Sequence, residues 1–552
     1  MRSKVFFWMW PFIFSIVVAF PVILPYLREG YFPTHDGEWA VVRLTDMFRT
    51  LRDFQIPARY SGNLNFGYGY PLFNFVYPFP YYFGTFMHFL GFGFVNTIKI
   101  LFAASVFLSA FFMFFASRIL WKNTWAGVIS MIMYTYFPYR MVDLYVRGSI
   151  GESLSFVLFP LLFYLAIKLV DKASVFLVGG IGISVGVLIM THNIMTVLFM
   201  PIFITFSLSQ IILKKKKVIK KFIVSIILGF GISAFFWIPA LFEKNNILLS
   251  KIPIADRNLY FVRLDQFLLP RWGYGAPTDP NGFSYQFGLV HLAVFLITIF
   301  SLVFIFVKDR KGFKEYFTKI AFIPIIISLL FTFLLFKPSD FLWSNIPLLS
   351  EINYPWIALG ILGFLVSLLA GFLCRQKYTR YIVICVSLIS IIMYLPYAKP
   401  QYYVDRRDNY YLTNEATTTS SNELMPLWVK KFPSQRPVNK VEIIKRRGNI
   451  ENIFSNSKQV KFSINALSQS TVRINTIYYP GWKAKVDGNE LPIYYRNDKG
   501  VMQISVPSGT HKVEASFNET PLRLTSNGIS LLSFFALLFI GAKGFYRRNN
   551  KN

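Results

Sequence analysis

Residues 5–27 read VFFWMWPFIFSIVVAFPVILPYL, which is 23 residues without a charged side chain. As an α-helix this stretch would be about 35 Å long, enough to cross the hydrocarbon core of a bilayer. It is too long for the core of a signal peptide and ends without small residues at a cleavage site, so we expect an uncleaved anchor. Arg2 and Lys4 precede it and predict a cytoplasmic N-terminus.

The rest of the chain has the composition of a polytopic membrane protein. Of its 552 residues, 54% are hydrophobic and only 15% are charged, whereas a soluble domain carries about 25% charged residues. The stretch from 71 to 92 is also apolar, but Pro71, Pro78 and Pro80 would break a helix there, which predicts an interfacial or re-entrant segment. With the first, the remaining apolar runs give twelve predicted spans, the others near 98–117, 125–141, 153–170, 174–191, 194–213, 222–242, 286–307, 320–336, 356–374, 381–397 and 527–545.

The formal net charge of +30 follows this topology. Loops assigned to the cytoplasm hold 24 of the 57 Lys and Arg residues but only three acids, Asp171, Asp309 and Glu315. Cations collect on the cytoplasmic side of membrane proteins, so the basic runs are a topology signal and no nucleic acid partner is expected. Both termini are therefore predicted to be cytoplasmic. The cations include the run from Lys214 to Lys217, then Arg310, Lys311, Lys314 and Lys551.

A change in composition after Ala398 divides the chain. Residues 1–397 are predicted to form an all-α transmembrane domain, 398–522 an extracytoplasmic β-rich domain, and 523–552 a last span with a cytoplasmic tail. Alternating apolar residues between turn sequences predict six strands in a small sandwich. Trp482 and the nearby tyrosines either stack on sugars or fill the core. The strands are expected at 460–467, 471–479, 482–486, 490–495, 501–506 and 511–517.

The first outer loop, 28–97, carries two carboxylates directly after the first span, in the sequence His35-Asp36-Gly37-Glu38. Apolar residues then recur with a helical period, which predicts an amphipathic helix over 38–54 lying on the membrane. Asp36 is accordingly either the N-cap of this helix or a reactive carboxylate held at the interface, and the two interpretations are compatible.

Several of these features resemble the type C (GT-C) glycosyltransferases, membrane enzymes that use polyprenyl-phosphate-linked sugars. They are the anchor, the acidic first outer loop, the membrane-parallel helix, the many spans and the C-terminal outer domain. Five short segments resemble bacterial membrane proteins described as pyruvoyl-tetrahydropterin-synthase-related, and the C-terminal part resembles teichoic-acid-glycosylating membrane proteins. The segments are Thr34 to Trp39, Gly67 to Tyr82, Arg147 to Glu152, Tyr479 to Lys483 and Val486 to Gly488.

The resemblance implies an inverting transfer from a polyprenyl-phosphate sugar to an extracytoplasmic glycan or glycolipid, with Asp36 as the catalytic base and Glu38 as its acidic neighbour. A phosphate leaving group is already a stable anion, so the site needs cations instead of a second acid. We expect Arg147 in this role first, then Arg59 and Arg271; Arg147 with Glu152 is alternatively a loop salt bridge. The other candidate binding residues are His35, His192 and Asn193.

Histidine and cysteine are too scattered to predict a zinc site, and a divalent metal requirement stays open. Two other classes remain as alternatives. A transporter or flippase of lipid-linked saccharides would place ionisable residues within spans and show repeated halves, and neither is evident in the sequence. A scaffold that presents the β domain without catalysis is the third.

Overall fold

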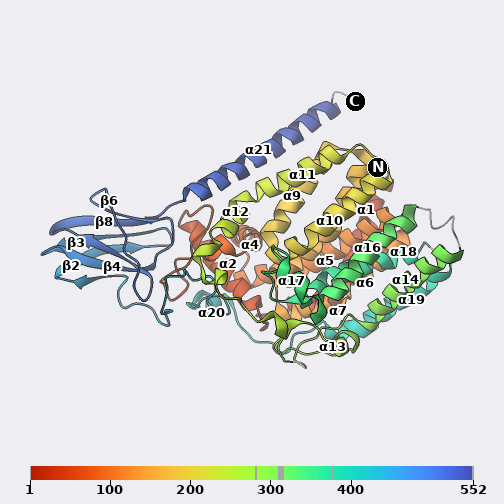
Figure 1. Ribbon diagram of the computed structural model, residues 1–552, viewed down its shortest axis with the longest axis horizontal. Coiled ribbons are helices and arrows are strands. Elements are labelled where there is room, and N and C mark those ends of the chain that lie inside the picture. The colour runs from red at the N-terminus through yellow and green to blue at the C-terminus, as the bar shows by residue number, and fades with distance from the viewer. Residues whose placement is uncertain (1, 280–281, 309–315, 376, 550–552) are drawn as a thin grey trace.

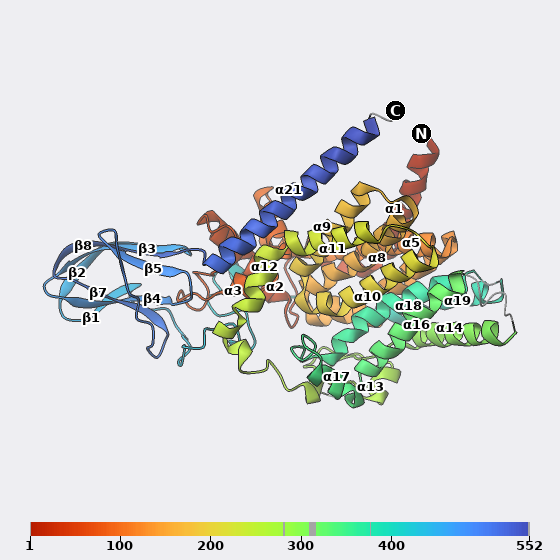
Figure 2. The same cartoon turned by 45° about the horizontal axis from the view of Figure 1, so that its top comes forward.

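The structure is a computed structural model that describes residues 2–279, 282–308, 316–375 and 377–549. A long helical bundle carries a β domain at one end, and both ends of the chain lie at the opposite end of the bundle (Figures 1 and 2). Part of the predicted cytoplasmic set lies outside the described residues, namely Asp309, Arg310, Lys311, Lys314, Glu315 and Lys551.

Within the described ranges, nine helices are long and apolar enough to cross a membrane. A multi-pass membrane protein is therefore confirmed. The helices that carry these segments are α1 (Arg2–Ile23), α5 (Phe94–Trp121), α8 (Ile150–Lys172), α10 (Asn193–Leu213), α14 (Leu289–Lys308), α16 (Tyr316–Leu334), α18 (Ala358–Leu373), α19 (Lys377–Tyr394) and α21 (Pro521–Asn549).

The expected number of twelve spans is not reached, because three predicted spans differ. Residues 125–141 are divided between α6 (Thr124–Thr135) and α7 (Pro138–Val142), since Pro138 cannot donate a backbone hydrogen bond to continue α6. Residues 222–242 form α11 (Ile219–Ile232) and α12 (Ala234–Phe242), which meet at 68° and count as a tenth span only if taken together. The third, α9 (Val175–Thr191), has 17 residues.

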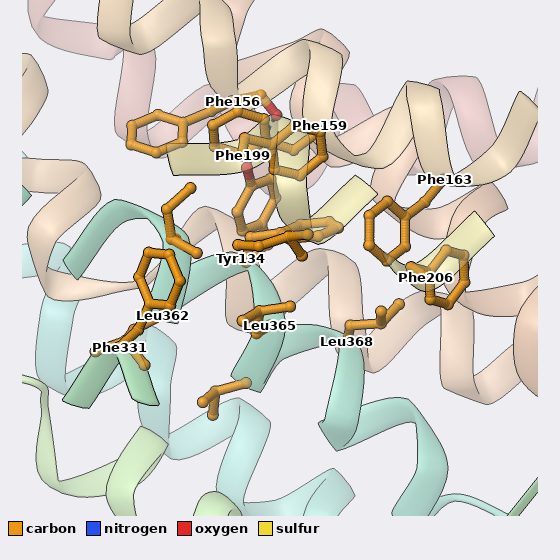
Figure 3. Close-up of a cluster of buried hydrophobic side chains, with 14 of the residues drawn as sticks. Tyr134, Phe156, Phe159, Phe163, Phe199, Phe206, Phe331, Leu362, Leu365 and Leu368 are labelled. Carbon is orange, nitrogen blue, oxygen red and sulfur yellow. Dashed lines mark hydrogen bonds between the residues drawn. The ribbon is translucent and has the colours of Figure 1, made fainter. Parts of the chain in front are cut away.

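Aromatic side chains fill the centre of the bundle where α6, α8, α10 and α18 meet (Figure 3). Phe159 stacks on Phe199 with ring centroids 4.1 Å apart, and Phe163 stacks on Phe206 at 3.9 Å. Every residue of α18 is buried. Burial of aromatic rings at these separations makes this part of the bundle a rigid support for the loops at its ends.

Between α1 and α5 the first outer loop folds into short helices that are not candidate spans. They are α2 (Gly37–Arg52), α3 (Leu72–Phe75) and α4 (Phe79–Phe89). Further short helices at the outer end are α13 (Leu264–Leu268), α17 (Asp340–Asn345) and α20 (Asp408–Leu412).

The polar side of α2 is covered, which the helical period did not predict. Asp46 belongs to the polar side of the predicted amphipathic helix, yet it is only 1% exposed. The segment that leads to the β domain lies against this side, because Arg43 Nε donates to Thr418 Oγ1 at 3.1 Å and Arg49 Nη2 donates to the Leu412 carbonyl at 3.1 Å. A chain segment nearly 400 residues away thus buries one face of a helix that sequence alone would leave on the membrane surface.

The C-terminal β domain is a sandwich of two antiparallel sheets, ordered β1-β4-β7 and β2-β3-β8-β5-β6. The six predicted strands are present. The sequence did not predict β1 and β2, and β2 is an exposed edge strand without apolar alternation. Trp482 and Tyr479 are buried and fill the core. The strands are β1 (Val441–Lys445), β2 (Gly448–Ser455), β3 (Gln459–Ala466), β4 (Ser470–Ile477), β5 (Trp482–Val486), β6 (Asn489–Leu491), β7 (Val501–Val506) and β8 (Gly509–Phe517).

A buried ion pair joins the β domain and α21 to the bundle. Arg523 Nη2 lies 2.7 Å from Glu243 Oε2, and Arg523 is fully buried. Glu243 also accepts from Tyr479 at 3.2 Å and from Asn74 at 2.9 Å, so groups from four distant parts of the chain meet at one carboxylate. These bonds fix the outer loop and the β domain relative to each other.

Candidate functional site

Asp36 occupies the N-cap position of α2, but its side chain makes no capping hydrogen bond. Thr34 Oγ1 accepts the bond from the Gly37 amide at 3.0 Å instead. The Asp36 carboxylate is therefore not used to cap the helix, and its side chain is 41% exposed. A carboxylate at the start of a helix is favoured by the helix dipole and held at a fixed point.

The start of α2 is attached to the turn between α7 and α8. The His35 amide donates to the Val146 carbonyl at 2.9 Å, and the Asp36 amide donates to the Arg147 carbonyl at 2.7 Å. Gly148 follows with φ +66°, and a Cβ on it would lie 2.1 Å from Thr34 Oγ1. Only glycine tolerates both this conformation and this contact, so Gly148 allows the start of α2 to lie this close to the turn.

Arg147 is the charged group nearest to Asp36, with Nη2 4.0 Å from Asp36 Oδ2. Its Nη1 forms an ion pair with Glu152, lies 3.9 Å from Asp143 Oδ1, and donates to the Tyr139 hydroxyl at 3.1 Å. The guanidinium also lies 4.6 Å from the centre of the Trp356 ring. Burial alone would lower the pKa of Arg147, but Glu152 and Tyr139 raise it well above its usual range, so the charge is permanent.

The two carboxylates behind Arg147 are fully buried. Tyr139 donates to Glu152 Oε1 at 2.7 Å, and Ser153 donates to Asp143. Burial and the neighbouring Glu152 raise the pKa of Asp143. One edge of the guanidinium is thus held by buried groups while the other faces Asp36, an arrangement that fixes a cation beside a partly exposed carboxylate.

Aromatic side chains from three other segments surround the pair. Tyr77 stacks on His192 with ring centroids 5.4 Å apart. Burial, and after it the charges of Tyr81 and Asp36, raise the pKa of Tyr77, and the opposite effect of Arg43 is smaller than their sum. Burial, then Tyr260 and then Asp36 raise the pKa of Tyr354 to about 12. These tyrosines stay protonated and can donate hydrogen bonds at neutral pH.

The structure brings only some of the predicted site residues together. His192 lies beside Tyr77 as the cap of α10, where its Nδ1 accepts from the Met195 amide at 3.2 Å. Burial lowers the pKa of His192 to about 3, so it is neutral. Asn193 is the first residue of α10. His35 is exposed, and its Nε2 lies 3.1 Å from the Tyr274 carbonyl.

Three predicted residues point to other partners. Glu38 forms an ion pair with Arg406 at 2.5 Å and accepts from the Tyr411 hydroxyl at 3.2 Å. Arg59 is 1% exposed and pairs with Glu519 at 3.3 Å. Arg271 lies 3.5 Å from Asp265 on the outer loop before α14. Each of the three charges is thus paired with an opposite charge, which is distant in the sequence for Glu38 and Arg59 and six residues away for Arg271.

Thr34, Tyr77, Tyr139 and Trp356 are the site residues that sequence reasoning missed. Tyr77 lies in the segment from Gly67 to Tyr82 that carried the family resemblance, so it had a signal. Tyr139 lies inside the predicted span 125–141 and Trp356 begins the predicted span 356–374, and an aromatic residue in an apolar run is ordinary and gives no signal. In the described part of the chain, no group of three or more His, Cys, Asp or Glu side chains is arranged to hold a metal ion.

Comparison of this sequence with known proteins shows which protein family it matches. Residues 73–402, more than half of the chain, match the model of a family described as "6-pyruvoyl-tetrahydropterin synthase related domain; membrane protein". A protein of Lactococcus lactis subsp. cremoris (strain MG1363) described as uncharacterized is 25% identical over 319 residues, 55% of this chain and 50% of its own. This chain therefore spans about half the length of that curated relative.

Two solved structures have partly similar shapes. The crystal structure of the Archaeoglobus fulgidus oligosaccharyltransferase in the apo form has 12% identity and a TM-score of 0.41, covering 74% of this chain and 56% of that chain. The archaeal oligosaccharyltransferase AglB from Archaeoglobus fulgidus, in complex with an inhibitory peptide and a dolichol-phosphate, has 11% identity and a TM-score of 0.41, covering 76% and 57%. Similarity at this level assigns no activity.

Proposed function

This chain belongs to the 6-pyruvoyl-tetrahydropterin synthase related family of membrane proteins, and we propose that it is a membrane glycosyltransferase acting on the extracytoplasmic side. The donor in this proposal is a sugar linked to a polyprenyl phosphate, and the acceptor is an extracytoplasmic glycan or glycolipid. The observation that carries the proposal is Asp36, a partly exposed carboxylate that does not cap its helix and lies 4.0 Å from a fixed guanidinium.

In the proposed reaction Asp36 accepts the proton of the acceptor hydroxyl as its oxygen attacks the anomeric carbon. The bond from this carbon to the phosphate oxygen breaks, and the electron pair leaves with the phosphate. Attack opposite to the leaving group inverts the anomeric configuration. One base suffices, because the phosphate leaves as a stable anion and needs no proton.

Glu38 has a different part in this proposal. Its ion pair with Arg406 attaches α2 to the segment that precedes the β domain, so it positions α2 without touching the reacting atoms. Arg147 holds a positive charge next to the reacting atoms and orients the Asp36 carboxylate, while Glu152 and Tyr139 prevent the guanidinium from moving.

The proposed orientation places the β domain and Asp36 outside the cell. Both termini lie at the end of the bundle opposite to the β domain (Figure 1), and the loops that the sequence assigns to the side of the termini hold 24 of the 57 Lys and Arg residues but only three acids. Cation-rich loops face the cytoplasm. Asp36 then lies where a lipid phosphate and an outer acceptor would meet.

The test is reconstitution of the full chain in proteoliposomes with a panel of polyprenyl-phosphate sugars and outer glycan acceptors. We expect a glycosylated product whose anomeric configuration, read by NMR, is opposite to that of the donor. Asp36→Asn should form product at least about 100-fold more slowly, while Glu29→Gln, a change at an outer-loop carboxylate that is 87% exposed, should match the wild type. Passage of lipid-linked sugar across the membrane without any transfer would instead support a transporter.

A further inference from the structure

Arg43 lies seven residues after Asp36 on α2, which places the two side chains on the same face of the helix about 10 Å apart along its axis. Side chains on a helix lean toward its N-terminus, so Arg43 reaches back in the direction of Asp36. Tyr77 lies against the start of α8 beside this site, since a Cβ on Gly151 would be 2.6 Å from its ring, and after the larger effect of burial the charges of Arg43 and Asp36 also act on its pKa. Arg43 therefore borders the candidate site.

The charge of Arg43 is not balanced by an acid. Among the residues that the structure describes, no Asp or Glu oxygen lies within 4.0 Å of its guanidinium, while Arg147, Arg59 and Arg271 each have such a partner. Its hydrogen bonds go to the hydroxyl and the carbonyl of Thr418 through Nε and Nη2. A guanidinium in a partly buried place without a counter-charge is costly, which favours binding of an anion there.

Two tyrosines complete the surroundings. Tyr77 and Tyr81 stack with ring centroids 6.0 Å apart on the α4 side of Arg43. Burial lowers the pKa of Arg43 but the hydroxyls of Tyr81 and Tyr77 raise it more, so both lie close to the guanidinium. Tyr81 is fully buried, and a hydrogen bond between its hydroxyl and Arg43 is among the interactions that raise the pKa of Arg43. The tyrosine hydroxyls therefore lie where they can donate to an anion that binds the guanidinium.

The charges around Arg147 make a second cation necessary for a phosphate. Glu152, Asp143 and Asp36 surround this single guanidinium. A phosphate brought to Arg147 alone would therefore have to compete with these carboxyl groups for the guanidinium. Arg43 is on the same side of α2 and has no such competitors.

We propose that Arg43, with the hydroxyls of Tyr77 and Tyr81, binds the phosphate group of a polyprenyl phosphate. Arginine suits this role because its planar donors match phosphate oxygens. The inference rests on the proposed function for its choice of lipid, but it concerns binding and does not require transfer.

The test measures binding to the full chain in nanodiscs, by titration with polyprenyl phosphate, with the polyprenol that lacks the phosphate, and with inorganic phosphate as competitor. The wild type should bind the lipid phosphate at least 10-fold more tightly than the alcohol. Arg43→Gln should abolish this preference, because a charged hydrogen-bonded contact of this kind is worth about tenfold or more in affinity. Arg43→Lys keeps the charge but not the planar donors and should retain an intermediate preference.

Arg49→Gln is the matched control. Arg49 lies on the same helix and donates to the Leu412 carbonyl of the same covering segment. Among the described residues, Tyr77 is not one of its contact partners. Its variant should keep the full preference. If Arg43→Gln does not fold, as judged by gel filtration, the intermediate result for Arg43→Lys and its loss at high salt decide the matter.

Two results would overturn the inference. Equal affinity of the wild type for the lipid phosphate and the alcohol would show that the protein has no phosphate site here. Equal affinity for inorganic phosphate and the lipid phosphate would show that the site does not recognise the lipid. Arg43-dependent binding without any sugar transfer would support the inference and count against the proposed function, so the two failures are distinguishable.

Discussion

Replacing Glu152 by Gln removes a buried negative charge and leaves the shape of the side chain. Glu152 is fully buried, its partner Arg147 is 11% exposed, and the Gln carbonyl can still accept from Tyr139. Loss of one partner from a buried pair costs about 3 to 5 kcal/mol. Because Asp36 at 4.0 Å still offers a negative charge to Arg147, we expect the lower limit, about 3 kcal/mol.

The assay is reversible unfolding in mixed micelles, titrated with SDS and followed by tryptophan fluorescence. Glu490→Gln is the control, because Glu490 pairs with Lys483 at 3.2 Å and both side chains are more than half exposed. This variant should lose less than about 1 kcal/mol. A double variant with Arg147→Gln should be no less stable than Glu152→Gln alone, since no unpaired guanidinium is left.

The reasoning fails if Glu152→Gln is as stable as the wild type, or if Glu490→Gln loses as much. Activity offers a second readout. In the folded fraction of Glu152→Gln, Arg147 is no longer held back from Asp36, so sugar transfer should fall at least tenfold while the affinity for the donor changes little.

The other expected outcomes concern residues around and behind the site. His192→Asn keeps an N-cap acceptor but does not titrate. The pKa of His192 is about 3 in the folded protein, compared with 6.5 for an exposed histidine in the unfolded chain. The wild type should therefore lose about 1.4 kcal/mol of stability relative to this variant for each pH unit below 6.5, as measured by unfolding at several pH values. No difference between them at pH 5 would refute the buried position. Gly148→Ala should lower transfer more than tenfold through the Thr34 contact, whereas Gly488→Ala, with φ +87° and nothing within 4 Å, should cost stability only through its backbone. Equal activity of both would contradict the attachment of α2 to this turn. Arg59→Gln should destabilise the fold by about 2 kcal/mol or more without changing KM for the donor, because Arg59 is bonded to Glu519 and Asn527; a raised KM in a stable variant would restore its predicted role in phosphate binding.

The membrane fold followed from the sequence because bilayer insertion depends on the length and apolar character of local segments. The exceptions are places where local and tertiary preferences differ. Pro138 ends a run that composition alone reads as a span, and β2 is an exposed edge strand without the alternation that identifies a half-buried one.

The candidate site was predictable only in part. Asp36 and Arg147 stand out in outer loops, but their proximity depends on backbone pairing between segments about 110 residues apart. Arg59 and Arg271 are each paired with an acid in the folded protein, so their charges are already balanced. For Arg59 the sequence could not show this, because Glu519 is 460 residues away. Arg43 drew no attention for the converse reason, since a cation on the polar side of an amphipathic helix is ordinary until a distant segment covers it.

The central claim is that Asp36 accepts the proton of the acceptor. Single-turnover transfer from a pre-bound polyprenyl-phosphate sugar tests it most directly, with the affinity for the donor measured in parallel for the wild type and Asp36→Asn. The account predicts that Asp36→Asn transfers sugar about 100- to 10,000-fold more slowly, the usual effect of a general base, while it binds the donor as tightly as the wild type. Transfer at the wild-type rate by Asp36→Asn would contradict it.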